Sequence, residues 1–214
     1  MDIYGGYTPV LNKLLNQMLE YFRKENKIHQ EQTGDSLYEH LIGRVKRPES
    51  MIEKCQRKEL PVTPESAMKK IRDSVGIRVV CNFIDDIYTC IDLIQDWDDV
   101  VIVKQKDYIT NAKPNGYRSY HMILDVERPE KDIEGNTPGH YYVEVQLRTI
   151  AMDTWASLEH EMKYKHKIKN PEMKYKHKIK NPEMIGKELK RVADELASCD
   201  VSMQTLRHLI REED

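Results

Sequence analysis

The sequence predicts an α/β fold, in which β-strands and helices are mixed along one chain. Two observations predict this class. Several segments alternate apolar and polar residues, as strands with one buried face do, and other segments repeat apolar residues at helical spacing. The length of 214 residues allows one domain with a well-buried core and helical appendages, but not two large enzymatic domains.

Helical periodicity and proline placement predict two helices near the start of the chain. Apolar residues recur at helical spacing from about Pro9 to about Asn26. A second helix is expected from Pro48 to Lys58, because Pro48 suits the first turn of a helix and Pro61 lies just past its far end. Further helices are expected at 67–72, 87–97, 152–165 and 185–210. The apolar stripe of the last one is expected to pack on its own domain or on a second subunit.

Four segments carry the β-branched residues or the alternation typical of strands, namely 73–84, 100–109, 117–126 and 140–149. In the third, Tyr117 and His121 share one face, and in the fourth Glu144 lies opposite the apolar side. If these strands are neighbours, Arg78, His121 and Glu144 belong to one polar surface. The residues expected in the core of the third and fourth strands are Tyr120, Met122, Leu124, Val126, Tyr141, Val143, Val145 and Leu147.

Composition and termini argue for a cytoplasmic protein without a membrane span. No run of about 18 apolar residues occurs, and the N-terminal sequence MDIYGGYTPV lacks the features of a signal peptide. The four cysteines show no CxxC spacing, so reduced thiols are a better interpretation than a zinc site. The formal charge of −2 argues against a nucleic-acid footprint over the whole surface.

Two clusters of residues have the chemistry of a nucleotide site. Residues 106–121 place lysines, an arginine and a histidine around Tyr117 and Gly116, which suits base stacking and phosphate binding. The alternative is a solvated hairpin with a core tyrosine. Arg44, Lys46 and Arg47 precede the second helix, whose N-terminus favours anions, so this patch could seat a triphosphate. A solvated basic face is the alternative.

The segment MKYKHKIKNPE occurs at 162–172 and again, unchanged, at 173–183. A solenoid needs three or more units, so this pattern indicates a local duplication. Pro171 and Pro182 are expected to break any continuous helix. The segment is predicted to be a solvated linker, although its eight lysines could contact RNA.

Five motifs in order resemble the synthetase domain of RelA/SpoT proteins: GRVKRPES, IRDSVGIRVV, KDYITNAKPNGYRSYH, VEVQLRT and WASLEHEMKYK. The length is similar to that of the stand-alone small alarmone synthetases. The resemblance covers roughly residues 37–165, and leaves 1–36 as an N-terminal helical extension and 166–214 as a basic linker with a C-terminal helix. It implies a nucleotidyltransferase-like mixed sheet of about five strands flanked by helices, and a homotetramer.

The resemblance also implies an activity. Such enzymes move the β,γ-pyrophosphate of ATP to the 3′-hydroxyl of GDP or GTP and make the alarmones ppGpp and pppGpp of the stringent response. The chain contains no His-Asp dipeptide and little room for the hydrolase domain of the long family members, so synthesis without hydrolysis is expected.

Roles for individual residues follow from matching the motifs. The resemblance assigns Asp73 and Glu144 to catalysis and to Mg²⁺, with Glu144 holding the metal or taking the proton of the attacking hydroxyl. It assigns Tyr117 to stacking on guanine. The residues that it assigns to ATP are Arg44, Lys46, Ser50, Lys54 and Arg78. The remaining residues that it assigns to the acceptor nucleotide are Asn115, His121 and Gln146.

Two alternatives remain open for the function. A toxin relative would pyrophosphorylate the 3′ end of tRNA, with the lysines of the duplicated segment on the RNA backbone. A catalytically silent module would use the same pocket only to bind a nucleotide or RNA. The presence of both Asp73 and Glu144 argues against the silent module.

Overall fold

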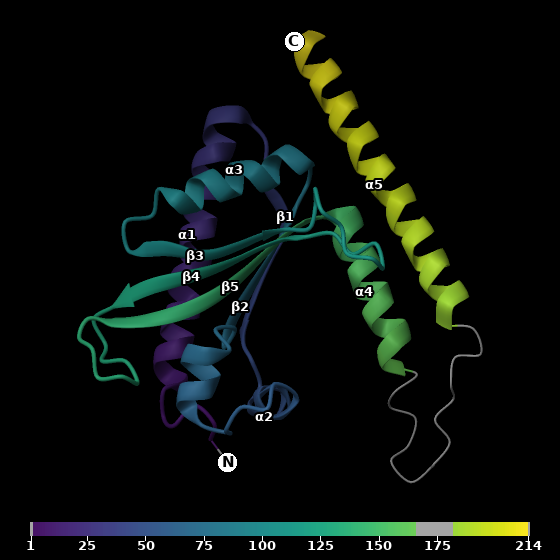
Figure 1. Cartoon of the computed structure of the whole chain (residues 1–214). Helices are drawn as coiled ribbons and strands as arrows, with labels where there is room; N and C mark the ends of the chain where they lie inside the picture. Colours follow the sequence, from purple (N-terminus) through teal and green to yellow (C-terminus); the bar gives the residue numbers. More distant parts are fainter. Residues whose placement is uncertain (1, 166–181, 214) are drawn as a thin grey trace.

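The structure is a computed structural model that describes residues 2–165 and 182–213 (Figure 1). In chain order its elements are α1 (Thr8–Thr33), β1 (Tyr38–Val45), α2 (Pro48–Arg57), the π-helical turn η1 (Ser66–Lys70), β2 (Val75–Cys81), α3 (Ile84–Gln95), β3 (Val100–Asp107), β4 (Tyr120–Arg128), β5 (Gly139–Thr149), α4 (Ile150–Lys165) and α5 (Pro182–Glu213). Among these residues, no helix is both long and apolar enough to cross a bilayer.

The sheet has five strands in the order β1-β2-β5-β4-β3. Strands β2 and β5 are parallel, whereas the other neighbouring pairs are antiparallel. This confirms the mixed five-stranded sheet. The edge strand β1 was not among the expected strands, because its sequence YEHLIGRV leaves every residue at least partly exposed and lacks a continuous apolar face.

One face of the sheet is buried under α1 and α3, which cross it on the same side (Figure 1). The predicted core residues of β4 and β5 are at most 8% exposed, so the expected facing of both strands is confirmed. Helix α1 approaches β1 closely at Gly43, where a Cβ atom would lie 2.6 Å from Leu15 Cδ1. The opposite face carries the polar residues of the site.

Several predicted boundaries were wrong. Helix α1 continues to Thr33 rather than ending near Asn26, and Gly34 ends it in the left-handed conformation with φ of 82°. The strand expected from Tyr117 begins at Tyr120, because the preceding segment forms turns closed by hydrogen bonds such as Gly116 N to Lys113 O. Most of the duplicated segment lies outside the described residues.

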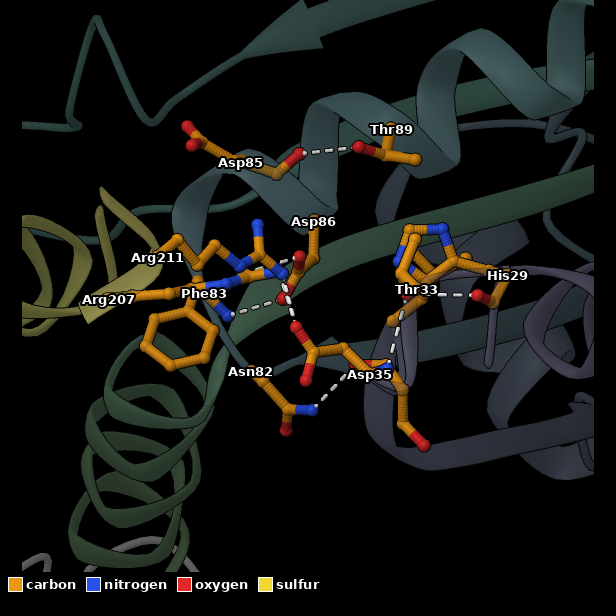
Figure 2. A network of polar contacts seen from close by, with 12 residues as sticks. His29, Thr33, Asp35, Asn82, Phe83, Asp85, Asp86, Thr89, Arg207 and Arg211 are labelled. Carbon is orange, nitrogen blue, oxygen red and sulfur yellow. Dashed lines mark hydrogen bonds and ion pairs between the residues drawn. The ribbon is translucent and has the colours of Figure 1, made fainter. Parts of the chain in front are cut away.

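Helix α5 docks its C-terminal half against α3 and against the connection between α1 and β1 (Figure 2). Arg207 donates to Asp86 at 2.7 Å and lies 4.4 Å from the ring centroid of Phe83, and Arg211 pairs with Asp35. Much of the predicted apolar stripe of α5 remains exposed within this chain. Its exposed members include Ile185, Val192, Met203, Leu206 and Ile210.

Candidate active site

The register of the sheet brings predicted site residues from three strands together on the polar face. On β5, Gln146 lies opposite Arg78 of β2 and opposite His121 of β4. One step away, Glu144 lies opposite Gly76 of β2. The predicted common surface of Arg78, His121 and Glu144 therefore forms because β5 lies between β2 and β4.

This surface opens into a pocket of about 420 Å³. Gly76 lies in its lining and has no other atom within 4 Å of the place where a Cβ would stand, so the missing side chain leaves open space there. The residues that line the pocket are Ile42, Arg44, Lys46, Lys54, Asp73, Gly76, Ile77, Arg78, Glu144 and Gln146. Both predicted catalytic carboxylates therefore face one cavity together with four cationic side chains.

Asp73 lies between η1 and β2 and is 5% exposed. Both Lys46 and Lys54 donate to its Oδ2 atom, whereas its buried Oδ1 atom has no hydrogen-bond partner. An unpaired buried oxygen is unfavourable, so Oδ1 is a ready ligand for a cation or a donor. Burial lowers the pKa of Lys46 and outweighs the opposing effect of Asp73. The preceding residue, Arg72, has φ of 61°, a strained conformation for a side chain of this size.

The two carboxylates fit a magnesium ion of the kind that is shared with a substrate. Mg²⁺ prefers oxygen ligands and is commonly held by one or two carboxylates together with substrate phosphates. Asp73 offers the unpaired Oδ1 and Glu144 faces the same pocket. Within the part of the chain that the structure describes, no group of three or more His, Cys, Asp or Glu residues forms an all-protein metal site.

Glu144 lies among hydrogen-bond donors and positive charges. Gln146 Nε2 donates to its Oε2 atom at 3.1 Å, and His121 Nδ1 lies 3.8 Å from its Oε1 atom. Burial raises the pKa of Glu144, but His121, Gln146 and Lys54 outweigh it, so the net pKa lies below its ordinary value. The carboxylate is therefore ionised near neutral pH.

A ring of contacts leads from Glu144 to Tyr117 and back. His121 Nε2 lies 2.7 Å from the Tyr117 hydroxyl, and Arg148 donates to that hydroxyl at 2.6 Å and to Gln146 Oε1 at 2.9 Å. Gln146 in turn donates to Glu144. The ring joins the pocket to the predicted guanine-stacking tyrosine.

Arg148 is a residue of this site that the sequence reasoning did not assign. It is only 5% exposed, and it also pairs with Asp153 at 3.1 Å, a carboxylate that Arg78 contacts at 3.2 Å. The signal was present in the sequence, because Arg148 continues the polar face of β5 two positions beyond Gln146. Burial of a charged residue on such a face cannot be read from the alternation alone.

Four predicted residues lie outside the lining of the pocket, namely Ser50, Asn115, Tyr117 and His121, and the last two are joined to it by the contacts described above. Ser50 lies in the first turns of α2, and its neighbour Lys54 reaches the pocket from one turn later. Asn115 lies in the turn before β4, where its amide donates to Glu159 Oε1 at 3.2 Å. Their assignments to ATP and to the acceptor remain predictions.

An aromatic cluster surrounds the Tyr117 side chain. Its ring centroid lies 6.1 Å from that of Tyr108 and 6.4 Å from that of Trp155, both at edge-to-face angles. The ammonium of Lys113 lies 4.5 Å from the same centroid. This cluster has the apolar surface and the positive charge that a nucleotide base with phosphates requires.

Comparisons with known proteins match the chain to one family. Residues 43–169 match a family model described as the region found in RelA / SpoT proteins. Over 140 residues the chain is 44% identical to GTP pyrophosphokinase YwaC of Bacillus subtilis. This alignment covers 65% of this chain and 63% of that protein. Over 185 residues it is 32% identical to GTP pyrophosphokinase YjbM of the same organism, covering 86% of this chain and 79% of that protein.

Solved structures show the same architecture over nearly the whole chain. Small alarmone synthetase 1 of Bacillus subtilis, bound to its product pppGpp, superimposes with a TM-score of 0.77 at 27% identity and covers 96% of both chains. Small alarmone synthetase 2 of that organism gives a TM-score of 0.74 at 34% identity, covering 93% of this chain and 95% of the other. The chain belongs to the RelA/SpoT family.

Proposed function

We propose that the chain is a GTP pyrophosphokinase that transfers the β,γ-pyrophosphate of ATP to the 3′-hydroxyl of GDP or GTP. One observation carries the proposal. A single pocket combines Asp73 and Glu144 with four cationic side chains, and a ring of contacts runs from Glu144 to Tyr117. Such a site can neutralise two polyphosphates at once and still hold an aromatic surface for the acceptor base.

The transfer requires alignment more than covalent chemistry. The 3′-oxygen attacks the β-phosphorus of ATP, the bond from that phosphorus to the oxygen bridging it to the α-phosphorus breaks, and AMP leaves. The hydroxyl proton passes to a base. Arg44, Lys46, Lys54 and Arg78 surround the cavity, so they would bind the donor phosphates and stabilise the charge that develops on their oxygens.

Glu144 serves the acceptor hydroxyl or the metal in this proposal. Its lowered pKa keeps the carboxylate ionised, which suits a metal ligand better than a strong base. Asp73 and Glu144 would hold Mg²⁺, which supplies neutralisation of phosphate charge when bound. The lysines on Asp73 Oδ2 leave its Oδ1 atom free for that contact.

The acceptor base would stack on Tyr117. Lys113 now lies 4.5 Å from the ring centroid and is exposed, so it can move aside and bind an acceptor phosphate. His121 and Gln146 lie between this ring and Glu144, where they would orient the ribose and its hydroxyl.

An acceptor assay tests the proposal. The protein is incubated with Mg²⁺, ATP labelled in the γ-phosphate, and GMP, GDP, GTP or tRNA. Label in a 3′-pyrophosphorylated GDP or GTP is expected. Label only in tRNA would indicate the toxin-like activity, and no labelled product with any acceptor would leave the silent binding module.

Assembly and location are also proposed. Exposed apolar residues on α5, such as Met203, Leu206 and Ile210, provide a surface for self-association, so we expect a homo-oligomer and specifically a tetramer. Light scattering after size-exclusion chromatography measures the subunit count. The substrates ATP and GTP are consistent with a cytoplasmic enzyme.

A further inference from the structure

Helix α5 touches the backbone of the acceptor loop, which we define as residues 108–119. Gly116 is buried with φ of 89°, and a Cβ atom there would lie 2.5 Å from Ala193 Cβ and 3.1 Å from Lys190 Cα. Only a residue without a side chain permits so close an approach. The loop therefore lies directly against one turn of α5.

Arg118 fastens the same turn of the loop to the helix. Its guanidinium donates to Asp194 Oδ1 at 3.0 Å, to the Ala193 carbonyl at 3.4 Å and to the Gly116 carbonyl at 3.3 Å. The side chain is 20% exposed. The Arg118 guanidinium thus binds α5 and the loop itself. Arg118 is not among the residues that line the pocket.

The contact continues to Tyr117. Trp155 of α4 lies 6.4 Å from the Tyr117 ring, and its indole Nε1 donates to the Leu189 carbonyl of α5 at 2.9 Å. Trp155 and Ala193 belong to one small apolar cluster on which Tyr117 packs. The ring expected to stack on guanine is therefore held by the same stretch of α5 that holds Gly116 and Arg118.

Helix α5 has a second, separate attachment to the domain. Arg207 and Arg211 bind Asp86 and Asp35 about four turns further along the helix (Figure 2). Loss of the Asp194 contact would leave this attachment intact. The influence of α5 on the loop can therefore be tested without detaching the helix.

We propose that α5 is a positioning element for the acceptor nucleotide. Asp194 binds Arg118 and Ala193 packs on Gly116, and these two contacts hold the loop that presents Tyr117. The inference rests on the proposed function, since it assumes that Tyr117 binds the acceptor. It assigns a role in acceptor binding to a helix that contributes no side chain to the pocket lining.

The test uses substitutions on α5. Asp194→Asn removes the negative charge that binds Arg118, whereas Asp194→Glu keeps that charge. Ala193→Leu introduces bulk where Gly116 packs. Glu195→Gln is the matched control, because Glu195 pairs with Arg191 on the exposed side of the same turn. Two quantities are measured: the KM values for GDP and for ATP, and the hydrogen exchange of the loop amides without nucleotide.

Asp194→Asn is expected to raise the KM for GDP about three- to fivefold, since a partly exposed ion pair is lost. Ala193→Leu is expected to raise it about tenfold or more through overpacking. Both variants should speed exchange in the loop and leave the KM for ATP unchanged. Asp194→Glu and Glu195→Gln should resemble the wild type.

Two results would overturn the inference. In one, loop exchange and the KM for GDP stay at wild-type values in both Asp194→Asn and Ala193→Leu. In the other, the KM values for ATP and GDP rise together, as in general destabilisation. If the wild type forms no product with any guanine nucleotide, the proposed function fails instead, and unchanged loop exchange in Ala193→Leu would then reject the hold of α5 on the loop.

Discussion

The proposed donor side and the proposed acceptor side of the site are built in different ways. On the donor side, Lys46 and Lys54 both bind Asp73 directly, and all three residues come from the first half of the chain. On the acceptor side, Tyr117 depends on His121, on Arg148 and on packing against α4 and α5. The donor side is therefore a cluster of charges, whereas the acceptor side also depends on packing against two C-terminal helices. Mutations should affect the two sides differently.

The largest effect is expected from a substitution of Glu144, the carboxylate that links the two sides. Glu144→Gln removes the negative charge that both lie against, so kcat should fall by about 10²- to 10⁴-fold. The affinity for ATP should stay nearly constant, because the four cations of the pocket remain. Steady-state kinetics and equilibrium titration with ATP measure the two quantities. Glu127→Gln, at the exposed end of β4, is the control, and unchanged turnover in Glu144→Gln would reject the assignment.

The next prediction concerns the anchor of η1, the turn that precedes Asp73. Asp132 is 2% exposed, and it accepts from Lys69 at 2.8 Å and from the backbone amides of Glu134 and Asn136. Asp132→Asn replaces one acceptor oxygen with an NH₂ group that would face other hydrogen-bond donors. It also removes the buried negative partner of Lys69. The free energy of unfolding should fall by about 3–5 kcal/mol. Glu134→Gln, which removes the exposed partner of the same lysine, should cost about 1 kcal/mol or less.

The same carboxylate predicts a pH dependence. Burial raises the pKa of Asp132, but Lys69 and Asn136 outweigh it, so the pKa lies below the ordinary value of 3.8. A depressed pKa contributes stability that is present above 3.8 and lost as the pH falls through the lowered pKa. Below pH 4, the free energy of unfolding measured in urea should therefore fall steeply with decreasing pH in the wild type and less steeply in Asp132→Asn. Parallel curves would contradict this account.

A smaller effect should separate acceptor from donor. Arg148→Lys keeps a charge but loses the fork that binds Tyr117, Gln146 and Asp153, at a cost of about 2–3 kcal/mol in unfolding free energy. The KM for GDP should rise about tenfold or more, with a smaller change in the KM for ATP. Arg128→Lys, which binds Glu130 at the far end of β4, should alter stability without altering either KM. Equal changes in both KM values would remove the distinction.

The smallest expected effect probes one hydroxyl. Tyr117→Phe keeps the ring and loses the contacts to His121 and Arg148, worth about 1 kcal/mol or about fivefold in the KM for GDP. Tyr108→Phe keeps the ring that contacts Tyr117 and should leave both KM values unchanged. A larger effect at Tyr108 than at Tyr117 would mean that the wrong ring has been assigned to the base.

Much of the fold and several residues of the pocket lining were predictable because local patterns encode them. The alternation in β5 placed Val143, Val145 and Glu144 on the correct faces, and the basic residues near Pro48 indicated an anion site. Strand β1 was missed because an edge strand with two partly exposed faces has no apolar period to detect. The strand expected from Tyr117 is shorter than predicted, because the ladders of β4 with β3 and β5 begin only at Tyr120.

The sequence by itself determined which face of each central strand is buried and which residues carry charge, because side-chain direction in a strand follows the period of two. Only the tertiary structure decided that Arg148 joins Tyr117 to Gln146, and that Arg118 binds α5. These pairs join residues 31 and 76 positions apart, Arg148 to Tyr117 and Arg118 to Asp194. No local pattern encodes such contacts, because they arise when strand order and helix docking bring distant segments together.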